Sequence, residues 1–337
     1  MQKSSPSALR RWILALAVGA ALPLQASAAD TELLNVSYDV ARELYKDVNP
    51  AFIAAYKQQA GETVTIKQSH GGSSKQARAV ADGLEASVVT MNQANDIDML
   101  ADKGLVAKDW AKKFPNNAAP YYSTMVFLVR KGNPKKVANW DDLARPGVQV
   151  IIPNPKTAGN GRYTYLAAWG SVLKKGGNAG QARDLVGRIF KNVPILDAGG
   201  RAATTTFTQR QIGDVLVTFE NEVSMVRAEF GDNFEVVYPT VSILAESPVA
   251  VVDKVVDRRN QRKQATAYLN FLYTSAGQEI GAKHFLRVRN EAVMKKHAAN
   301  YKPIALFTVD EVFGGWRQAQ KTHFDDGGEF DKIYQSK

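Results

Sequence analysis

The sequence predicts an α/β protein of two α/β domains with a ligand cleft between them, and three observations support this. The chain has 337 residues, a length that usually corresponds to two domains. Short apolar strands alternate with amphipathic helices in two separate runs, which is the pattern of parallel α/β sheets. Gly- and Ser-rich turns open helices in both runs, at the sheet edge where ligands usually bind.

The first run contains three expected strands, at residues 33–37, 64–68 and 87–91. A helix follows the first strand, because apolar residues from Val40 to Phe52 recur at spacings of three and four. A second helix follows the Gly71–Ser73 turn. The polar residues at the ends of the strands are Asp39, Asn92 and Gln93. Because the carboxyl ends of parallel strands share one edge, these residues are expected to lie together.

The second run contains six expected strands, at residues 124–130, 148–152, 193–196, 215–219, 234–238 and 243–253. Two helices open from turns within this run, one after Thr157 and one after Gly199. Two further helices are expected near the end of the chain, at residues 265–273 and 277–285. The second run therefore repeats the strand–turn–helix order of the first.

Three turns of small residues open these helices, at residues 69–74, 157–161 and 199–204. A helix start leaves backbone N–H groups without partners and carries a partial positive charge. Small residues there let an anion approach the bare backbone. One such turn alone is typical of an ordinary helix N-cap. Three in equivalent places of two α/β halves predict a shared anion site.

The first 28 residues are expected to be an export signal. They combine basic residues at Lys3, Arg10 and Arg11 with an apolar stretch at 12–24 and small residues before residue 29. This stretch is short for a membrane span, which needs about twenty residues. The chain has no cysteine, which is ordinary for a protein of the bacterial periplasm. The expected product is a soluble periplasmic protein.

The charge pattern argues against nucleic-acid binding. The formal net charge is +10, but basic residues are spread along the chain among acidic ones rather than clustered. A modest positive field would instead attract small anions. The four histidines stand far apart and lack carboxylates at the spacing of metal ligands, so neither a metal site nor a cofactor is expected.

Seven segments carry a family resemblance that runs from about residue 33 to 330, namely 33–39, 68–77, 127–134, 153–157, 165–170, 213–216 and 243–246. They closely resemble periplasmic sulfate- and thiosulfate-binding proteins. The resemblance implies a type II periplasmic binding protein that closes on its anion. Such a protein is expected to be a monomer and not an enzyme. It would deliver the anion to the permease and ATPase subunits of an ABC importer. It also implies a domain division into a signal peptide at 1–28, domain 1 at 29–123 plus 244–337, and domain 2 at 124–243.

The resemblance implies a site made mainly of backbone N–H donors. Carried over by position, these donors are Asp39, Ser73, Gly159, Asn160 and Gly200. Two positions depart from the sulfate-binding pattern: Ala158 stands where a serine hydroxyl is expected, and Phe219 where an indole N–H is expected. Phe219 together with Asn92 and Gln93 is more similar to the thiosulfate-binding branch.

Thr157, Arg162 and Arg201 are expected to surround this site rather than to contact the anion. Two other functions remain open on the sequence alone. One is binding of another oxyanion, such as molybdate or an organic sulfonate. The other, from a different class, is an exported hydrolase that uses Ser73 or Ser74, with His70 as its base.

Overall fold

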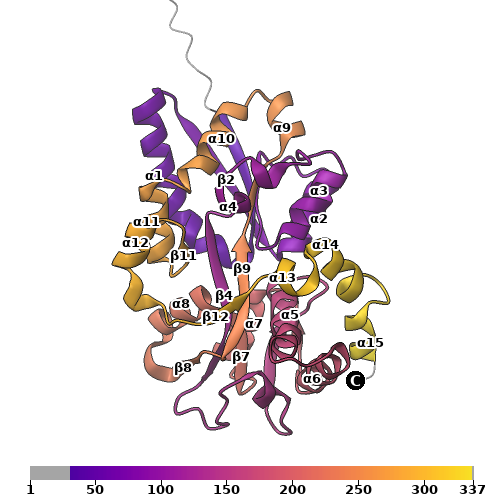
Figure 1. Ribbon diagram of the computed structural model, residues 1–337. Helices are drawn as coiled ribbons and strands as arrows, with labels where there is room; N and C mark the ends of the chain where they lie inside the picture. Colours follow the sequence, from indigo (N-terminus) through magenta and orange to yellow (C-terminus); the bar gives the residue numbers. More distant parts are fainter. Residues whose placement is uncertain (1–30, 336–337) are drawn as a thin grey trace, which may run out of the picture.

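The structure, a computed structural model, describes residues 31–335. The predicted signal peptide lies outside the described residues. The chain forms two α/β lobes, one above the other in Figure 1, each built on its own sheet. The predicted α/β class with two lobes is therefore confirmed. Between residues 31 and 335, no helix combines the length and the apolar character that a membrane crossing requires.

The first lobe is built on a four-stranded sheet in the order β10-β3-β1-β2. Its strands are β1 (Thr31–Tyr38), β2 (Val64–Gly71), β3 (Val88–Thr90) and β10 (Val249–Val251). The first three are parallel and β10 is antiparallel to β3. Two parts of the chain supply the helices around this sheet. Residues 39–118 form η1 (Asp39–Ala41), α1 (Arg42–Ala60), α2 (Ser73–Ala81), α3 (Ala94–Asp102), η2 (Trp110–Lys112) and α4 (Pro115–Ala118). Residues 253–300 form α9 (Asp253–Arg258), α10 (Arg262–Phe271), α11 (Ser275–Lys283), α12 (Glu291–Lys296) and η5 (Ala298–Asn300).

The second sheet has eight strands, six of them in the order β12-β9-β4-β7-β5-β6, while β8 and β11 also pair with β4. The strands are β4 (Tyr121–Arg130), β5 (Val150–Pro153), β6 (Leu196–Asp197), β7 (Val215–Phe219), β8 (Phe234–Val237), β9 (Val241–Ser247), β11 (Arg287–Val288) and β12 (Ala305–Phe307). The remaining helices are η3 (Trp140–Ala144), α5 (Gly159–Lys174), α6 (Ala179–Lys191), α7 (Gly200–Thr208), α8 (Glu220–Phe230), η4 (Gly231–Asn233), α13 (Val309–Phe313), α14 (Trp316–Ala319), η6 (Gln320–Phe324) and α15 (Glu329–Gln335).

Two long strands, β4 and β9, run between the lobes (Figure 1). Residues 121–124 of β4 pair antiparallel with residues 244–247 of β9, and the far end of β4 pairs with β7 and β8. Both expected domain boundaries, near residues 124 and 244, fall inside these two strands. The division into domains stays a prediction, because the C-terminal segment contacts both lobes.

The single strand predicted at residues 243–253 is wrong. The chain forms β9 and β10 there, which belong to different sheets. Pro248 separates them, because proline has no N–H to continue a ladder. Its carbonyl oxygen instead accepts the N–H of Met91 at 2.9 Å. The break thus carries the chain from the second sheet back to the first.

His323 is expected to make the protein less stable as the solution is acidified. Its buried ring packs against Trp169 and Phe313, and its Nδ1 lies 3.1 Å from the Tyr165 hydroxyl. Burial lowers the pKa of His323 to about 4, so between about pH 6.5 and 4 only the unfolded chain binds this proton. The free energy of unfolding should therefore fall by about 3 kcal/mol as the pH drops through this window, about 2 kcal/mol of it above pH 5.

Urea unfolding at pH 7, 6 and 5 tests this expectation, with His323→Phe as the comparison. The substitution removes the titrating ring and keeps an aromatic side chain, so the slope between pH 7 and 5 should flatten. An equal slope in both proteins would contradict the assignment to His323.

Candidate functional site

Four helical segments begin at or shortly after the ends of strands, at the edge where the lobes face one another. They are η1 after β1, α2 after β2, α5 after β5 and α7 after β6. The residues at their N-caps are Tyr38, Gly72, Ala158 and Gly199, and none makes a side-chain cap hydrogen bond. By contrast, Asn178 caps α6 and Thr274 caps α11. The N-cap residues of the four starts thus supply none of the side-chain acceptors that Ser, Thr, Asn or Asp usually provide, although the Asp39 carboxylate accepts the N–H groups of Val40 in η1 and Arg201 in α7.

Backbone contacts bring these starts together across the two lobes. A β-carbon placed on Gly72 would lie 2.8 Å from the Thr157 carbonyl oxygen and 3.4 Å from that of Ala198. The Asp39 carboxylate accepts the N–H of Arg201, in the first turn of α7, at 3.2 Å. A β-carbon on Gly200 would lie 3.2 Å from the Asn160 Nδ2. Elements on both sides of the cleft therefore meet with only backbone or short side chains between them.

The loop after β3 lies against the start of α5. Asn92 is buried, its Oδ1 has no hydrogen-bond partner, and a β-carbon on Gly159 would overlap that atom. Next to it, Gln93 donates from Nε2 to the Ser74 hydroxyl at 2.9 Å. The structure thus places the predicted pair Asn92 and Gln93 beside both α2 and α5.

The side chain of Ser73 is engaged away from the cleft. Its hydroxyl donates to the Asp96 carboxylate at 2.5 Å and accepts the N–H of Asn92 at 3.3 Å. The backbone N–H at the start of α2 is a separate group from this hydroxyl. Ser73 can therefore contribute its amide while its side chain holds the loop after β3 in place.

Behind α5 and α7 lies a buried polar network that the sequence did not reveal. Asn160 donates from Nδ2 to the Thr218 hydroxyl at 2.9 Å, and Thr218 donates to Glu222 at 2.5 Å. Thr204 donates to the other Glu222 oxygen at 2.6 Å. Burial raises the pKa of Glu222 despite these hydrogen bonds. The network joins the first turn of α5 to α7 and α8, so it fixes the relative positions of two helix starts.

The two arginines lie at the borders of this region. Arg162 is buried, donates from Nε to the Pro155 carbonyl at 2.9 Å, and its Nη1 stands 4.0 Å from Asp96. Burial lowers its pKa. Arg201 follows Gly200, and its Nη2 is buried without a partner. The Arg162 guanidinium is thus engaged by the protein around the start of α5, whereas Arg201 contributes its backbone N–H to Asp39.

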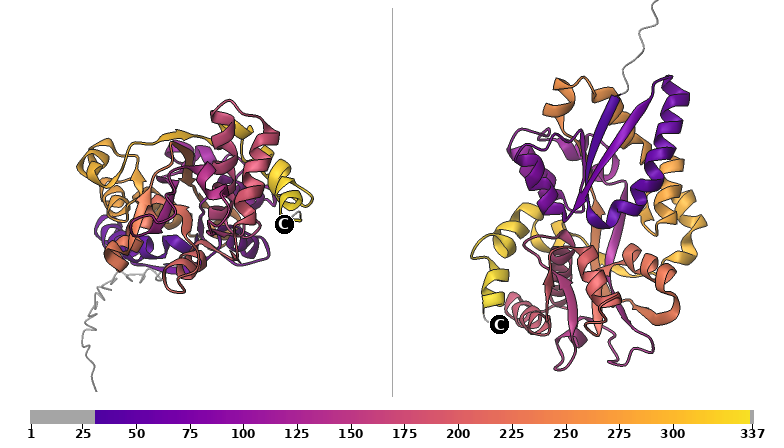
Figure 2. Two further views of the ribbon diagram at one scale, coloured as in Figure 1. Left: turned by 90° about the horizontal axis from the view of Figure 1, so that it is seen from below. Right: turned by 180° about the vertical axis from the view of Figure 1, so that it is seen from behind.

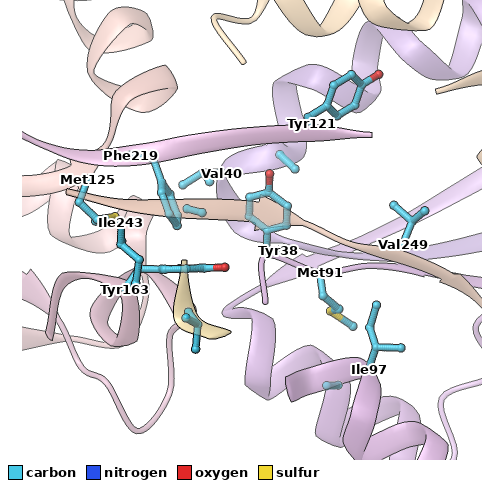
Figure 3. Packing of buried hydrophobic residues seen from close by; sticks show 14 of the residues in the cluster. Tyr38, Val40, Met91, Ile97, Tyr121, Met125, Tyr163, Phe219, Ile243 and Val249 are labelled. Atoms are coloured by element: carbon cyan, nitrogen blue, oxygen red, sulfur yellow. The ribbon is translucent and has the colours of Figure 1, made fainter. Parts of the chain in front are cut away.

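Ala158 and Phe219 form an apolar part of the site's surroundings. Ala158 is 2% exposed at the N-cap of α5, and Phe219 is 4% exposed at the end of β7. The Phe219 ring packs against Tyr163 with centroids 5.8 Å apart, and Figure 3 shows Tyr38 of the first lobe nearby. Thr157 donates its hydroxyl to the Ala198 carbonyl at 3.0 Å. Ala158 and Phe219 therefore present no side-chain donor at the positions where the resemblance expects a serine hydroxyl and an indole N–H, and the Thr157 hydroxyl is engaged by Ala198.

The geometry does not assemble a serine hydrolase. The Ser73 hydroxyl donates to Asp96 and the Ser74 hydroxyl accepts from Gln93, while the buried His70 Nδ1 has no partner. Within residues 31–335, no hydrogen bond joins His70 to either serine. The His, Asp and Glu side chains of this part of the chain also form no group of three that could hold a metal ion.

The chain has two α/β lobes joined by β4 and β9, and helix starts from both lobes face one another where the lobes meet, a region that we call the seam. This arrangement defines a two-lobed solute-binding protein. The comparison with known proteins agrees, because the profile of the bacterial extracellular solute-binding proteins matches residues 37–287. The chain belongs to this family of solute-binding proteins, which are not enzymes.

Among its relatives, a thiosulfate-binding protein of Pseudomonas aeruginosa is 60% identical over 95% of this chain and 96% of its own length. A sulfate-binding protein of Escherichia coli is 53% identical over 91% and 94%. Among solved structures, the sulfate-binding protein SubI of Mycobacterium tuberculosis is 33% identical with a TM-score of 0.79, covering 88% of this chain and 100% of its own. The predicted resemblance to sulfate- and thiosulfate-binding proteins is thus confirmed.

Proposed function

We propose that this protein captures thiosulfate or sulfate between its lobes and delivers the anion to the permease and ATPase subunits of an ABC importer. The ligands named for its relatives support this class of anion. Delivery requires an exported protein, so we also propose that residues 1–28 are removed and that the mature monomer works in the periplasm. No nucleic acid and no cofactor takes part.

One observation carries the proposal: four helix starts from two lobes converge, and none is capped by the side chain of its own N-cap residue. Each start offers N–H groups and a partial positive charge of about half an elementary charge. The donors assigned to the anion are the N–H groups of Asp39, Ser73, Gly159, Asn160 and Gly200. Because they come from both lobes, the bound anion would stabilise the closed arrangement.

The apolar surroundings favour thiosulfate as the preferred ligand. Thiosulfate carries a terminal sulfur that is larger than an oxygen and accepts hydrogen bonds weakly. Ala158 and Phe219 offer such an atom an apolar wall where a sulfate oxygen would find no donor. The 60% identity to a thiosulfate-binding protein points in the same direction.

Titration calorimetry on ligand-stripped protein tests the proposal with thiosulfate, sulfate, phosphate and molybdate. We expect thiosulfate to bind more tightly than sulfate, and both more tightly than phosphate and molybdate. Tighter binding of sulfate would contradict the thiosulfate preference. Failure of both sulfur oxyanions to bind would contradict the proposed function itself.

Replacing Ala158 by serine is expected to tighten sulfate binding about tenfold. A hydroxyl at this N-cap would restore a donor to a charged oxygen, and such a hydrogen bond contributes about 1.5 kcal/mol or more. Thiosulfate should gain less if its sulfur faces this wall. Calorimetry with both anions measures the two changes on one variant. Unchanged sulfate affinity would mean that position 158 does not face the ligand.

A further inference from the structure

The C-terminal segment, residues 305–335, is anchored to the second lobe. It begins with β12, which pairs parallel with residues 241–243 of β9, and it ends with α15 against α6 (Figures 1 and 2). Two ion pairs fix its end: Lys156 lies 2.8 Å from Asp331, and Arg183 lies 2.5 Å from Glu329. The segment therefore moves with the second lobe.

Between these anchors, the segment reaches the first lobe at Arg317. The guanidinium of Arg317, on α14, donates from Nη1 and Nη2 to the two oxygens of Asp102 at 2.9 and 3.0 Å. Its Nε also lies 3.7 Å from Asp98. Both aspartates belong to α3. A neighbouring contact joins α3 to η6, because Asn95 donates to the Gln320 side chain at 3.2 Å.

Arg317 stands between two hollows that have walls from both lobes. One, of about 310 Å³, is lined by Arg78 and Asp98 of the first lobe and by Arg162 and Asp325 on the other side. The second, of about 510 Å³, is lined by Trp110 and by Trp316. Arg317 lines both. The side chains of Arg317 and Asp102 are themselves exposed, while the neighbouring Trp316 packs on Tyr163 of the second lobe, so the ion pair can form and break without repacking that contact.

We propose that Arg317 is a positioning residue for closure. Its ion pairs with Asp102 and Asp98 of α3 stabilise the closed arrangement of the lobes and slow the dissociation of the anion. This rests on the proposed function, namely that the protein closes on its ligand. An interaction made only in the closed arrangement raises its population and thereby the apparent affinity. The effect should lie in the dissociation rate, because Arg317 has no contact with the four helix starts.

The expected effect of the Arg317–Asp102 ion pair on binding is modest, because both side chains are largely exposed. Arg317 and Asp102 are 61% and 59% exposed, and exposed ion pairs are weak and screened by salt. The two-pronged geometry and the second carboxylate of Asp98 place this contact at the stronger end of that class. We expect Arg317→Met to raise the dissociation constant and the dissociation rate about threefold at low ionic strength.

Stopped-flow binding and calorimetry with thiosulfate and sulfate test the proposal on Arg317→Met, Asp102→Asn and the double variant. The double variant should be no worse than Arg317→Met, and the difference from the wild type should vanish in 0.5 M NaCl. Arg262→Met is the matched control. Arg262, whose side chain is 48% exposed, makes a two-pronged pair with Asp257 at 2.7 Å and contacts Asp253, wholly inside the first lobe, so its loss should leave binding unchanged.

The outcomes separate this proposal from the proposed function. A wild type that binds neither anion would overturn the proposed function and, with it, the role of Arg317. A wild type that binds, with Arg317→Met dissociating at the wild-type rate or no faster than Arg262→Met, would overturn the role of Arg317 alone. A threefold faster dissociation with an unchanged association rate would support it.

Discussion

Replacing Gly72 by alanine is expected to raise the dissociation constant for thiosulfate about a hundredfold while leaving the folded lobes intact. The added methyl carbon would lie 2.8 Å from the Thr157 carbonyl oxygen, which belongs to the opposite lobe. A backbone oxygen cannot rotate away as a side chain can. We therefore expect a cost near the upper end for an unaccommodated methyl group, about 3 kcal/mol, which corresponds to about two orders of magnitude in affinity.

The adjacent glycine provides the control for this variant. The three atoms nearest to a β-carbon on Gly71 all belong to the Gln76 side chain of its own lobe, and the nearest would lie 3.4 Å away. Gly71→Ala should therefore bind nearly as the wild type does. Because Gly72 has a φ of −55°, alanine fits its backbone, and the melting temperature without ligand should not change. Wild-type affinity in Gly72→Ala would mean that the lobes do not close at this contact during binding.

Replacing Glu222 by alanine is expected to lower the free energy of unfolding by about 3 kcal/mol or more. The side chain is fully buried and accepts the hydroxyls of Thr204 and Thr218. Its removal leaves a cavity and two donors without their acceptor, and each orphaned polar group costs about 1–3 kcal/mol. Anion affinity should fall as well, because Asn160 is held through Thr218.

Glu222→Gln keeps the volume without the charge and serves as the comparison. Burial raises the pKa of Glu222 in the folded protein. The folded protein therefore binds the Glu222 proton more tightly than the unfolded chain does, and the stability gained in this way at low pH is lost as the pH rises through the pKa of the folded state. Urea unfolding from pH 5 to 8 should show a smaller loss of stability with rising pH in Glu222→Gln. A Glu222→Ala protein within 1 kcal/mol of the wild type would contradict the structural role of the network.

Most of the fold could be predicted from local patterns. The strand expected at 215–219 coincides with β7, and apolar spacing located α1, because both signals depend on neighbours in sequence. The helix α6 was not predicted, although Asn178 and Gln181 form a capping box that marks its start. The exchange of sheets at Pro248 was missed because a proline can also sit at the edge of one strand.

Only the backbone features of the candidate site, the turns of small residues at the helix starts, could be predicted from the sequence. Turns of small residues are visible in sequence, so Gly72, Gly159 and Gly200 could be singled out, and the structure brings their surroundings together. The anion donors themselves remain proposals. The Thr204–Glu222–Thr218 network was not visible, because α7, β7 and α8 must pack before these side chains meet. The contact of Arg317 with Asp102 joins residues 215 positions apart, and no local pattern encodes it.

A crystal structure of the protein with thiosulfate tests the central claim most directly. We predict the anion in the seam between the lobes, with the backbone nitrogens of Asp39, Ser73, Gly159, Asn160 and Gly200 within about 3.2 Å of its atoms. No lysine or arginine side chain should touch it. An anion held by the Arg162 or Arg201 guanidinium, or bound outside the seam, would contradict a site built from main-chain amides.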